Sequence, residues 1–167
     1  ILADTALAAL LPELPGGTRA FLSGYQYLKR EDEFIRAASQ VRAIRDAKRG
    51  NRAHIECISV TDPRINAGII RHILPAADSA GMNENELSLL LGHPLEPSPE
   101  HLVKGVLELA KKTGLARIHL HTYGLYLLAA REDRARPKLS RDALLFAATI
   151  TAAAARGTTI AVSPHGI

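Results

Sequence analysis

The segment HIECISV (54–60) places two polar side chains inside an apolar run. His54 and Glu56 are two residues apart, so in a β-strand both side chains point to the same face. A buried carboxylate without a partner is strongly destabilising, so Glu56 requires a cation, a metal or water nearby. Two interpretations follow: an edge strand with this face in solvent, or a carboxylate that serves a metal or phosphate site.

A second group of polar residues begins the leucine-rich segment SAGMNENELSLLLG (79–92). Asn83 and Glu86 have the spacing of a capping box, in which each side chain accepts a hydrogen bond from the other residue's backbone N–H. Capping alone explains the pair. A helix N-terminus also favours anions, and a carboxylate there can hold the magnesium ion that accompanies a nucleotide phosphate. The two interpretations are compatible.

The segment ARIHLHTYG (116–124) repeats the polar pattern of the first strand. His119 and His121 share one face, and Thr122 follows at the carboxyl end of the run. A His-x-His pair can bind a metal, but no third ligand is evident nearby in the sequence, which disfavours zinc. We expect one histidine to pack against a neighbouring strand and the other, with Thr122, to line a ligand crevice.

Several common catalytic motifs are absent from the sequence. It has no GxGxxG dinucleotide fingerprint and no GxxxxGK[ST] phosphate loop, which excludes a Rossmann or P-loop nucleotide site. It also has no Ser-His-Asp or Cys-His arrangement with local support for an activated nucleophile.

The elements around these motifs alternate between short apolar strands and amphipathic helices. We expect strands at 19–24, 54–60, 116–124 and 158–163, with a short extended piece near 78–81. We expect helices at 31–48, after the Asp62-Pro63 cap, within 79–92, from the Ser98-Pro99 cap to Gly114, and from the Ser140 cap to about Arg156, ended by Gly157. This alternation predicts an α/β fold: a three-layer αβα sandwich with a mainly parallel sheet and right-handed crossovers. Ligands bind beyond the carboxyl ends of such strands, which is where all three motifs would meet.

The composition indicates one globular domain and disfavours several kinds of partner. The 167 residues are 47% hydrophobic, enough for a core, and the 21 basic residues are scattered among 17 acidic ones. With three Phe, four Tyr and no Trp, the chain is poorly suited to stack nucleic-acid bases. The single Cys57 excludes an internal disulfide and a cysteine-based zinc site, so we expect a reducing, cytoplasmic location. No apolar run reaches the roughly 18 residues of a membrane span.

Several stretches, in this order, resemble the ADP-dependent glucokinase and phosphofructokinase family, a branch of the ribokinase-like kinases. The matching stretches are FLSGYQYL (21–28), HIECISVTD (54–62), ILPAADSAGMNENEL (73–87), RIHLHTYGLYLL (117–128) and ALLFAATITAAAA (143–155). The resemblance implies a ribokinase-like fold and places His54 and Glu56 on the family's HxE motif. It places Asn83 and Glu86 on the NxxE motif.

The resemblance also implies a role for each of these residues. Glu56 and Glu86 would belong to a magnesium network, directly or through water, with His54 in support. Asn83 would contact the nucleotide, and His121 with Thr122 would form a nucleotide-contacting strand end. The implied reaction is the transfer of a phosphoryl group from ADP to glucose or fructose 6-phosphate, which releases AMP.

The sequence departs from the family pattern at both ends. The family's catalytic aspartate lies in a GxGD motif after the last strand expected here, and the sequence contains no GxGD. The upstream part that supplies the sugar pocket and lid is missing as well. We therefore expect residues 1–167 to form one incomplete α/β domain, inactive alone, of a sugar-kinase parent.

Two other functions stay open at this point. The chain could be a ribokinase-like module that binds nucleotide without catalysis, or part of an ATP-dependent sugar kinase of the ribokinase type. A GxGD motif a few tens of residues beyond Ile167 would favour the kinase over the module. The choice between glucose and fructose 6-phosphate depends on residues upstream of this sequence.

Overall fold

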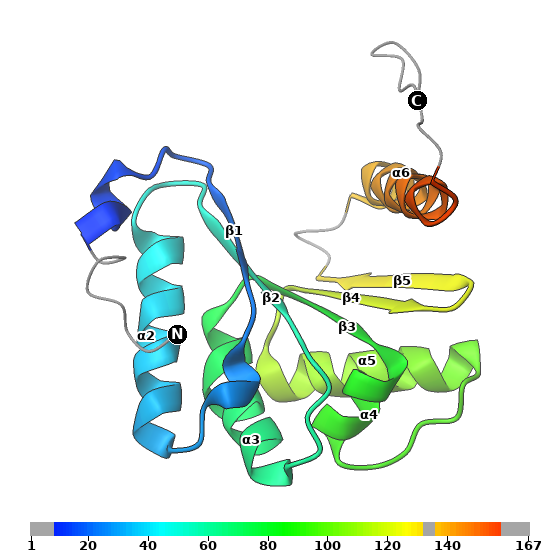
Figure 1. The fold of residues 1–167 in the computed structure, drawn as a ribbon, viewed down its shortest axis with the longest axis horizontal. Coiled ribbons are helices and arrows are strands. Elements are labelled where there is room, and N and C mark those ends of the chain that lie inside the picture. Colours follow the sequence, from blue (N-terminus) through cyan, green and yellow to red (C-terminus); the bar gives the residue numbers. More distant parts are fainter. Residues whose placement is uncertain (1–8, 132–135, 158–167) are drawn as a thin grey trace. The chain divides into compact units, whose positions relative to one another are not determined.

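A computed structural model describes residues 9–131 and 136–157, which belong to two compact units divided after Arg131. The first unit contains a five-stranded sheet in the order β1-β2-β3-β4-β5 (Figure 1). Its strands are β1 (Arg19–Leu22), β2 (Arg52–Glu56), β3 (Ser79–Asn83), β4 (Arg117–Thr122) and β5 (Leu125–Ala130). The first four strands are parallel and β5 is antiparallel to β4. The expected α/β class with a mainly parallel sheet is therefore confirmed.

The helices of the first unit cover one face of this sheet. They are α2 (Glu31–Asp46), α3 (Pro63–Gly68) with its π-helical and 3-10 extensions (Ile69–Ile73 and Leu74–Ala76), α4 (Glu84–Leu91) and α5 (Pro99–Thr113). The parallel strands follow one another in sequence order, and right-handed crossovers in one direction place every connection on the same side. Figure 1 shows α2 to α5 on that side. This unit thus presents one helix layer and one sheet layer, and the three-layer arrangement stays a prediction.

The strands alternate between a buried apolar face and a polar face. The core side chains of the three central strands are Ala53, Ile55, Ala80, Met82, Ile118 and Leu120. They pack in one cluster with apolar residues of α2 and α5, such as Val41 and Val106. The polar side chains at the alternate positions, His54, Glu56, Ser79, His119 and His121, are only partly buried, and we call their side of the sheet the polar face.

The expected helix caps are confirmed in the first unit. The Asp62 carboxylate accepts a hydrogen bond from the Arg64 N–H at 2.9 Å, with Pro63 at the first helical position of α3. Ser98 accepts from the His101 N–H at the start of α5, and Gly114 ends that helix with a φ of 70°. Each cap needs only residues that are close in sequence, which is why the sequence predicts it.

Several strand ends differ from expectation by one or two residues, and two differences are larger. Strand β2 ends at Glu56 rather than continuing to residue 60. The Cys57 N–H still donates to the Gly81 carbonyl oxygen at 2.9 Å, and the chain then leaves the sheet. Strand β5 was not predicted: a two-residue turn, Tyr123-Gly124, returns the chain against β4, with Gly124 at a φ of 83°. Strands and helices therefore do not alternate throughout.

The second unit contains α6 (Pro137–Ala155). The expected start at Ser140 is wrong, because Pro137 occupies the first helical position and the Ser140 N–H already donates to the Arg136 carbonyl oxygen at 2.8 Å. Gly157, with a φ of 67°, follows the end of the helix as expected. The strand expected at 158–163 lies outside the described residues. None of the described helices, including this alanine-rich one, is long and apolar enough to cross a membrane.

Candidate active site at the carboxyl ends of the strands

The Glu56 side chain lies over Gly81 of the neighbouring strand. Glu56 is paired in register with Gly81, and Gly81 with His119 of β4, so these three residues form one row across the polar face. A Cβ atom built on Gly81 would overlap the Oε2 atom of Glu56 and would lie 3.0 Å from the Nε2 atom of His54. The missing side chain at Gly81 is therefore what leaves room for the carboxylate.

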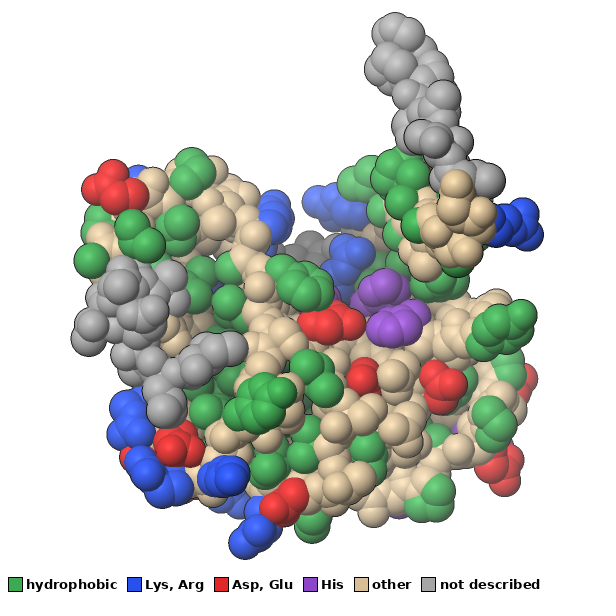
Figure 2. All heavy atoms as spheres, viewed as in Figure 1, with side chains coloured by type: hydrophobic (Ala, Val, Ile, Leu, Met, Phe, Trp, Pro, Cys, Tyr) green, Lys and Arg blue, Asp and Glu red, His purple; other side chains and the backbone are tan. Residues whose placement is uncertain are grey.

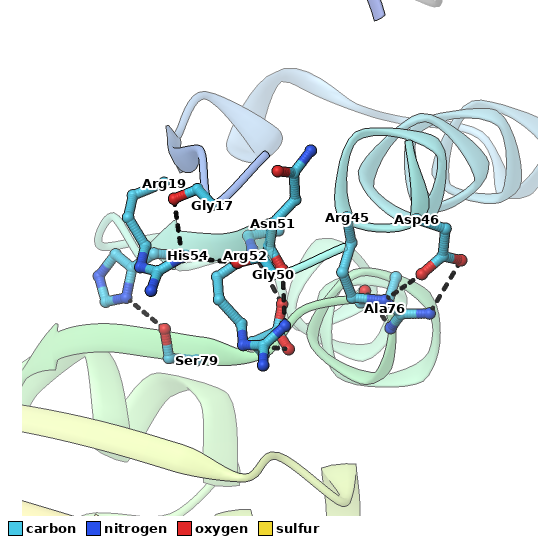
Figure 3. Close-up of polar contacts among 12 residues, drawn as sticks. Gly17, Arg19, Arg45, Asp46, Gly50, Asn51, Arg52, His54, Ala76 and Ser79 are labelled. Carbon is cyan, nitrogen blue, oxygen red and sulfur yellow. Dashed lines mark hydrogen bonds and ion pairs between the residues drawn. The ribbon is translucent and has the colours of Figure 1, made fainter. Parts of the chain in front are cut away.

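The His54 ring is held on three sides. Its Nδ1 atom lies 2.8 Å from the Ser79 hydroxyl oxygen, as Figure 3 shows, and its Nε2 atom lies 3.4 Å from Glu56 Oε2. The Phe21 ring stacks on it, with ring centroids 5.3 Å apart. His54 thus connects the side chains of β1, β2 and β3 on the polar face.

The capping box predicted at the start of α4 is confirmed. The Asn83 Oδ1 atom accepts a hydrogen bond from the Glu86 N–H at 2.9 Å, and Glu86 Oε2 accepts from the Asn83 N–H at 2.8 Å. The Ser59 hydroxyl donates to Glu86 Oε1 at 3.4 Å. Glu86 is buried, so its carboxylate is fixed at the positive end of the helix dipole.

The charges of both glutamates affect the ionisation of the Cys57 thiol. Burial, and after it the negative charges of Glu86 and Glu56, together raise the pKa of this thiol to about 12. Both carboxylates therefore act on the same short segment after β2. The thiol stays protonated at neutral pH and is no nucleophile.

The two histidines of β4 have different surroundings. The His119 ring stacks on Tyr126 of β5, with centroids 6.3 Å apart, so the expectation that one histidine packs against a neighbouring strand is confirmed. Burial lowers the pKa of His119, the nearby His121 lowers it further, and the Glu56 charge opposes both. In the part of the chain that the structure describes, the buried Nε2 atom of His119 has no hydrogen-bond partner.

His121 and Thr122 lie at the end of β4 that adjoins the capping box. His121 is paired in register with Asn83 on one side and with Tyr126 on the other. The Thr122 hydroxyl makes one long contact, 3.5 Å, to the Tyr123 carbonyl oxygen. Figure 2 shows histidine (purple) and acidic (red) side chains next to one another on the face viewed.

The sequence-predicted residues come together on three adjacent strands. His54 and Glu56 lie on β2, Asn83 and Glu86 at the junction of β3 and α4, and His121 with Thr122 at the end of β4. Sequence reasoning missed the residues that position this set: Phe21, Ser59, Ser79 and Gly81. Ser79 and Gly81 alternate along β3, and this alternation was their only signal, because their partners are set by the register between strands.

The donor set fits a magnesium ion that binds together with a phosphate. Among residues 9–131 and 136–157, no group of three or more His, Cys, Asp or Glu could hold a metal ion. Magnesium needs no such cage, because it keeps several waters and takes one or two carboxylates plus phosphate oxygens. Among the described residues, the buried Nε2 atom of His119 lacks a hydrogen-bond partner, which a bound ligand or a water would supply.

The chain is similar in sequence and in fold to several known kinases. The chain is 34% identical over 155 residues to the ADP-dependent glucose/glucosamine kinase of Pyrococcus furiosus, a match that covers 81% of this chain and 32% of that protein. A solved structure of an ADP-dependent kinase in complex with fructose 6-phosphate and ADPβS superposes with a TM-score of 0.80 at 26% identity. That match covers 90% of this chain and 37% of the other. The chain thus spans about a third of the length of these relatives.

A more distant likeness concerns the fold alone. The phosphomethylpyrimidine kinase of Clostridium difficile superposes with a TM-score of 0.61 at 9% identity, over 77% of this chain and 55% of that one. This likeness supports a ribokinase-like fold for the present chain, as the resemblance implied. The sequence pattern of the conserved region of ADP-specific phosphofructokinases and glucokinases matches residues 6–166, almost the whole chain. The chain therefore belongs to the family of ADP-specific phosphofructokinases and glucokinases.

Proposed function

We propose that the full-length protein transfers a phosphoryl group from ADP to a hexose or hexose phosphate and releases AMP, with magnesium. Family membership supports the class of reaction. The observation that carries the proposal is the convergence of the Glu56 carboxylate, over Gly81, and the Glu86 carboxylate, in its capping box, at adjacent strand ends. Two fixed carboxylates at the carboxyl edge of a parallel sheet suit a magnesium–nucleotide site.

Each residue of the site has a proposed part in this reaction. Glu56 and Glu86 hold the magnesium ion, directly or through water, and Asn83, His121 and Thr122 contact the nucleotide. When bound, the ion offsets negative charge on the phosphate oxygens. His54 supports Glu56 through the Nε2 contact.

The chain's own contribution is preorganisation. Phosphoryl transfer depends mainly on positioning and charge neutralisation, with little covalent chemistry for the protein. The Glu86 carboxylate is held by the Asn83 N–H and the Ser59 hydroxyl, so it does not have to reorganise when the nucleotide binds. The 167 residues contain no GxGD motif, so the base that takes the sugar hydroxyl proton comes from outside them.

The acceptor is a hexose or its phosphate, and the relatives differ on which. The kinase of Pyrococcus furiosus is named for glucose and glucosamine, whereas the solved complex contains fructose 6-phosphate. Both belong to one reaction class, so the site described here serves either acceptor. The remainder of the protein would make the choice.

The test is nucleotide product analysis with the full-length protein and magnesium. ADP and ATP are offered as donors, each with glucose and with fructose 6-phosphate. We expect AMP from ADP with one of the two acceptors and no transfer from ATP. Transfer from ATP alone would identify an ATP-dependent kinase, nucleotide binding without transfer would identify a binding module, and neither binding nor transfer would refute the proposal.

A further inference from the structure

The position of Glu56 depends on a side chain that the proposed function does not use, Ser79. Ser79 is paired in register with His54, and its hydroxyl is 2.8 Å from the Nδ1 atom of that ring. Figure 3 shows the ring of His54 directed at this hydroxyl from the neighbouring strand. The other ring nitrogen of His54 lies 3.4 Å from Glu56 Oε2. Ser79, His54 and Glu56 therefore form a chain of polar contacts along the polar face.

The chemistry of the groups fixes the direction of these hydrogen bonds. An ionised carboxylate only accepts, so the proton between His54 and Glu56 belongs to Nε2. In the neutral imidazole, Nδ1 is then an acceptor. The Ser79 hydroxyl is able to donate and to accept, so it donates to Nδ1. Glu56 thus selects the Nε2–H tautomer, and removal of the Ser79 hydroxyl takes away the hydrogen bond that holds the other side of the ring.

Among the side chains that the structure describes, the hydrogen bond from His54 is the polar contact of the Glu56 carboxylate. The carboxylate occupies the space that Gly81 leaves open, so no side chain of β3 packs under it. Glu86, by contrast, accepts hydrogen bonds from the Asn83 N–H and the Ser59 hydroxyl. The His54 Nε2–H is therefore the contact that orients Glu56, and the orientation of His54 becomes decisive.

We propose that Ser79 is a positioning residue of the site: through His54 it holds the Glu56 carboxylate over Gly81, where magnesium and phosphate bind. The last step rests on the proposed function. Groups that orient a ligand of a metal typically change metal affinity by about 10–100-fold when removed. Ser79 acts through one further side chain, so we expect a value near the lower end.

The experiment compares Ser79→Ala, Ser79→Thr and a matched control, Ser39→Ala, in the full-length protein. Ser39 lies on α2, where its exposed hydroxyl donates to the Ile35 carbonyl oxygen, away from the polar face. Two readouts are measured: the ring ¹⁵N shifts of His54, assigned with His54→Gln, and the Kd of ADP with magnesium by calorimetry. Thermal unfolding confirms that each variant is folded.

In the wild type and in Ser79→Thr we expect a protonated Nε2 and a bare Nδ1 on His54. In Ser79→Ala we expect the ¹⁵N shift of Nδ1 to change because its hydrogen bond is lost, and a Kd that is about tenfold higher. Ser39→Ala should match the wild type in both readouts.

Three results would overturn the inference. The first is a Ser79→Ala variant with the same Nδ1 shift and the same affinity as the wild type. The second is a Ser79→Thr variant that binds ADP as weakly as Ser79→Ala. In both cases ADP binding by the wild type would leave the proposed function standing. A wild type that binds no ADP with magnesium would remove the proposed function and this inference together, even if the tautomer of His54 were as expected.

Discussion

Helices α4 and α5 begin with similar caps in different surroundings. Asn83 and Ser98 are both N-caps whose side chains accept a backbone hydrogen bond from the residue three positions on. Asn83 is also the last residue of β3, and the Glu86 that completes its capping box is buried beside the sheet. Ser98 follows a loop, and the neighbouring His101 side chain contacts the exposed Glu96 at 3.3 Å.

The comparison teaches that a cap motif acquires a functional role from its position. The hydrogen bonds at Asn83 and Ser98 satisfy free backbone groups in the same way. Only the α4 cap places a fixed carboxylate at the carboxyl end of a parallel strand, where ligands bind. We therefore expect changes at α4 to affect ligand binding and changes at α5 to affect stability alone.

The largest expected effect concerns the reactivity of Cys57, whose pKa is influenced by the charge of Glu86 in the α4 cap. Its pKa is raised to about 12, by burial and then by Glu86 and Glu56, from an ordinary value of 9.0. A difference of about three pKa units lowers the thiolate fraction at pH 8 about 1000-fold. Labelling by a thiol reagent should be slower in the native protein than in the urea-unfolded protein by about that factor.

The raised pKa of this thiol also makes the free energy of unfolding depend on pH. The pKa of the thiol is higher in the folded state than in the unfolded state, where it is near 9.0. The contribution of the thiol to the free energy of unfolding is therefore fully present below pH 9.0 and is lost as the pH rises toward 12. Glu86→Gln should speed native labelling, since one negative charge is removed, and Ser98→Ala should not. Equal labelling of native and unfolded protein would contradict the raised pKa of Cys57.

Glu86→Gln should lower kcat of the full-length protein by about 100-fold, with little change in KM for the sugar. Glutamine still accepts the hydrogen bond from the Asn83 N–H, so the cap survives while the charge is lost. Steady-state kinetics at saturating magnesium, together with thermal unfolding, separate the two effects. An unchanged kcat would remove Glu86 from the proposed magnesium site.

Gly81→Ala should weaken the binding of ADP with magnesium by about tenfold. The added methyl group would overlap Glu56 Oε2 and force the carboxylate out of its cradle. Gly105→Ala in α5 is the matched control, because its Cβ would meet only apolar side chains, Leu95 at 2.8 Å and Leu87 at 3.2 Å, and no carboxylate. We expect the control to lose stability but to keep its Kd, which calorimetry and thermal unfolding together measure.

The smallest expected effect is that of Ser98→Ala. Loss of an N-cap hydroxyl typically costs about 1 kcal/mol of stability. Urea unfolding should report that loss, and the Kd for ADP should not change. A change in nucleotide affinity would mean that the two caps are not functionally distinct.

The features that the sequence predicts are those set by nearby residues. The caps at Asp62, Asn83 and Ser98 each join residues two or three positions apart, and each was predicted. The polar pairs on β2 and β4 were also visible, because alternation assigns them to one face before the sheet is known. Family resemblance then supplied roles for them.

The features that the sequence does not predict depend on pairing between strands. That Glu56 lies over Gly81, and that Ser79 faces His54, follows only from the register of β2 and β3. Strand β5 was missed because its apolar run carries no distinct strand pattern, and the Tyr123-Gly124 turn was not recognised as a hairpin. Local pattern thus indicates which residues are unusual, while register decides what they contact.

The direct passage from β3 into α4 has a consequence for motion. Asn83 ends the strand and Glu84 begins the helix, so no loop residue lies between them to act as a hinge. The start of α4 is therefore joined directly to the sheet, and a shift of β3 is passed on to the capping box. An inserted residue after Asn83 would rotate the helix by about 100° and turn Glu86 away from the sheet.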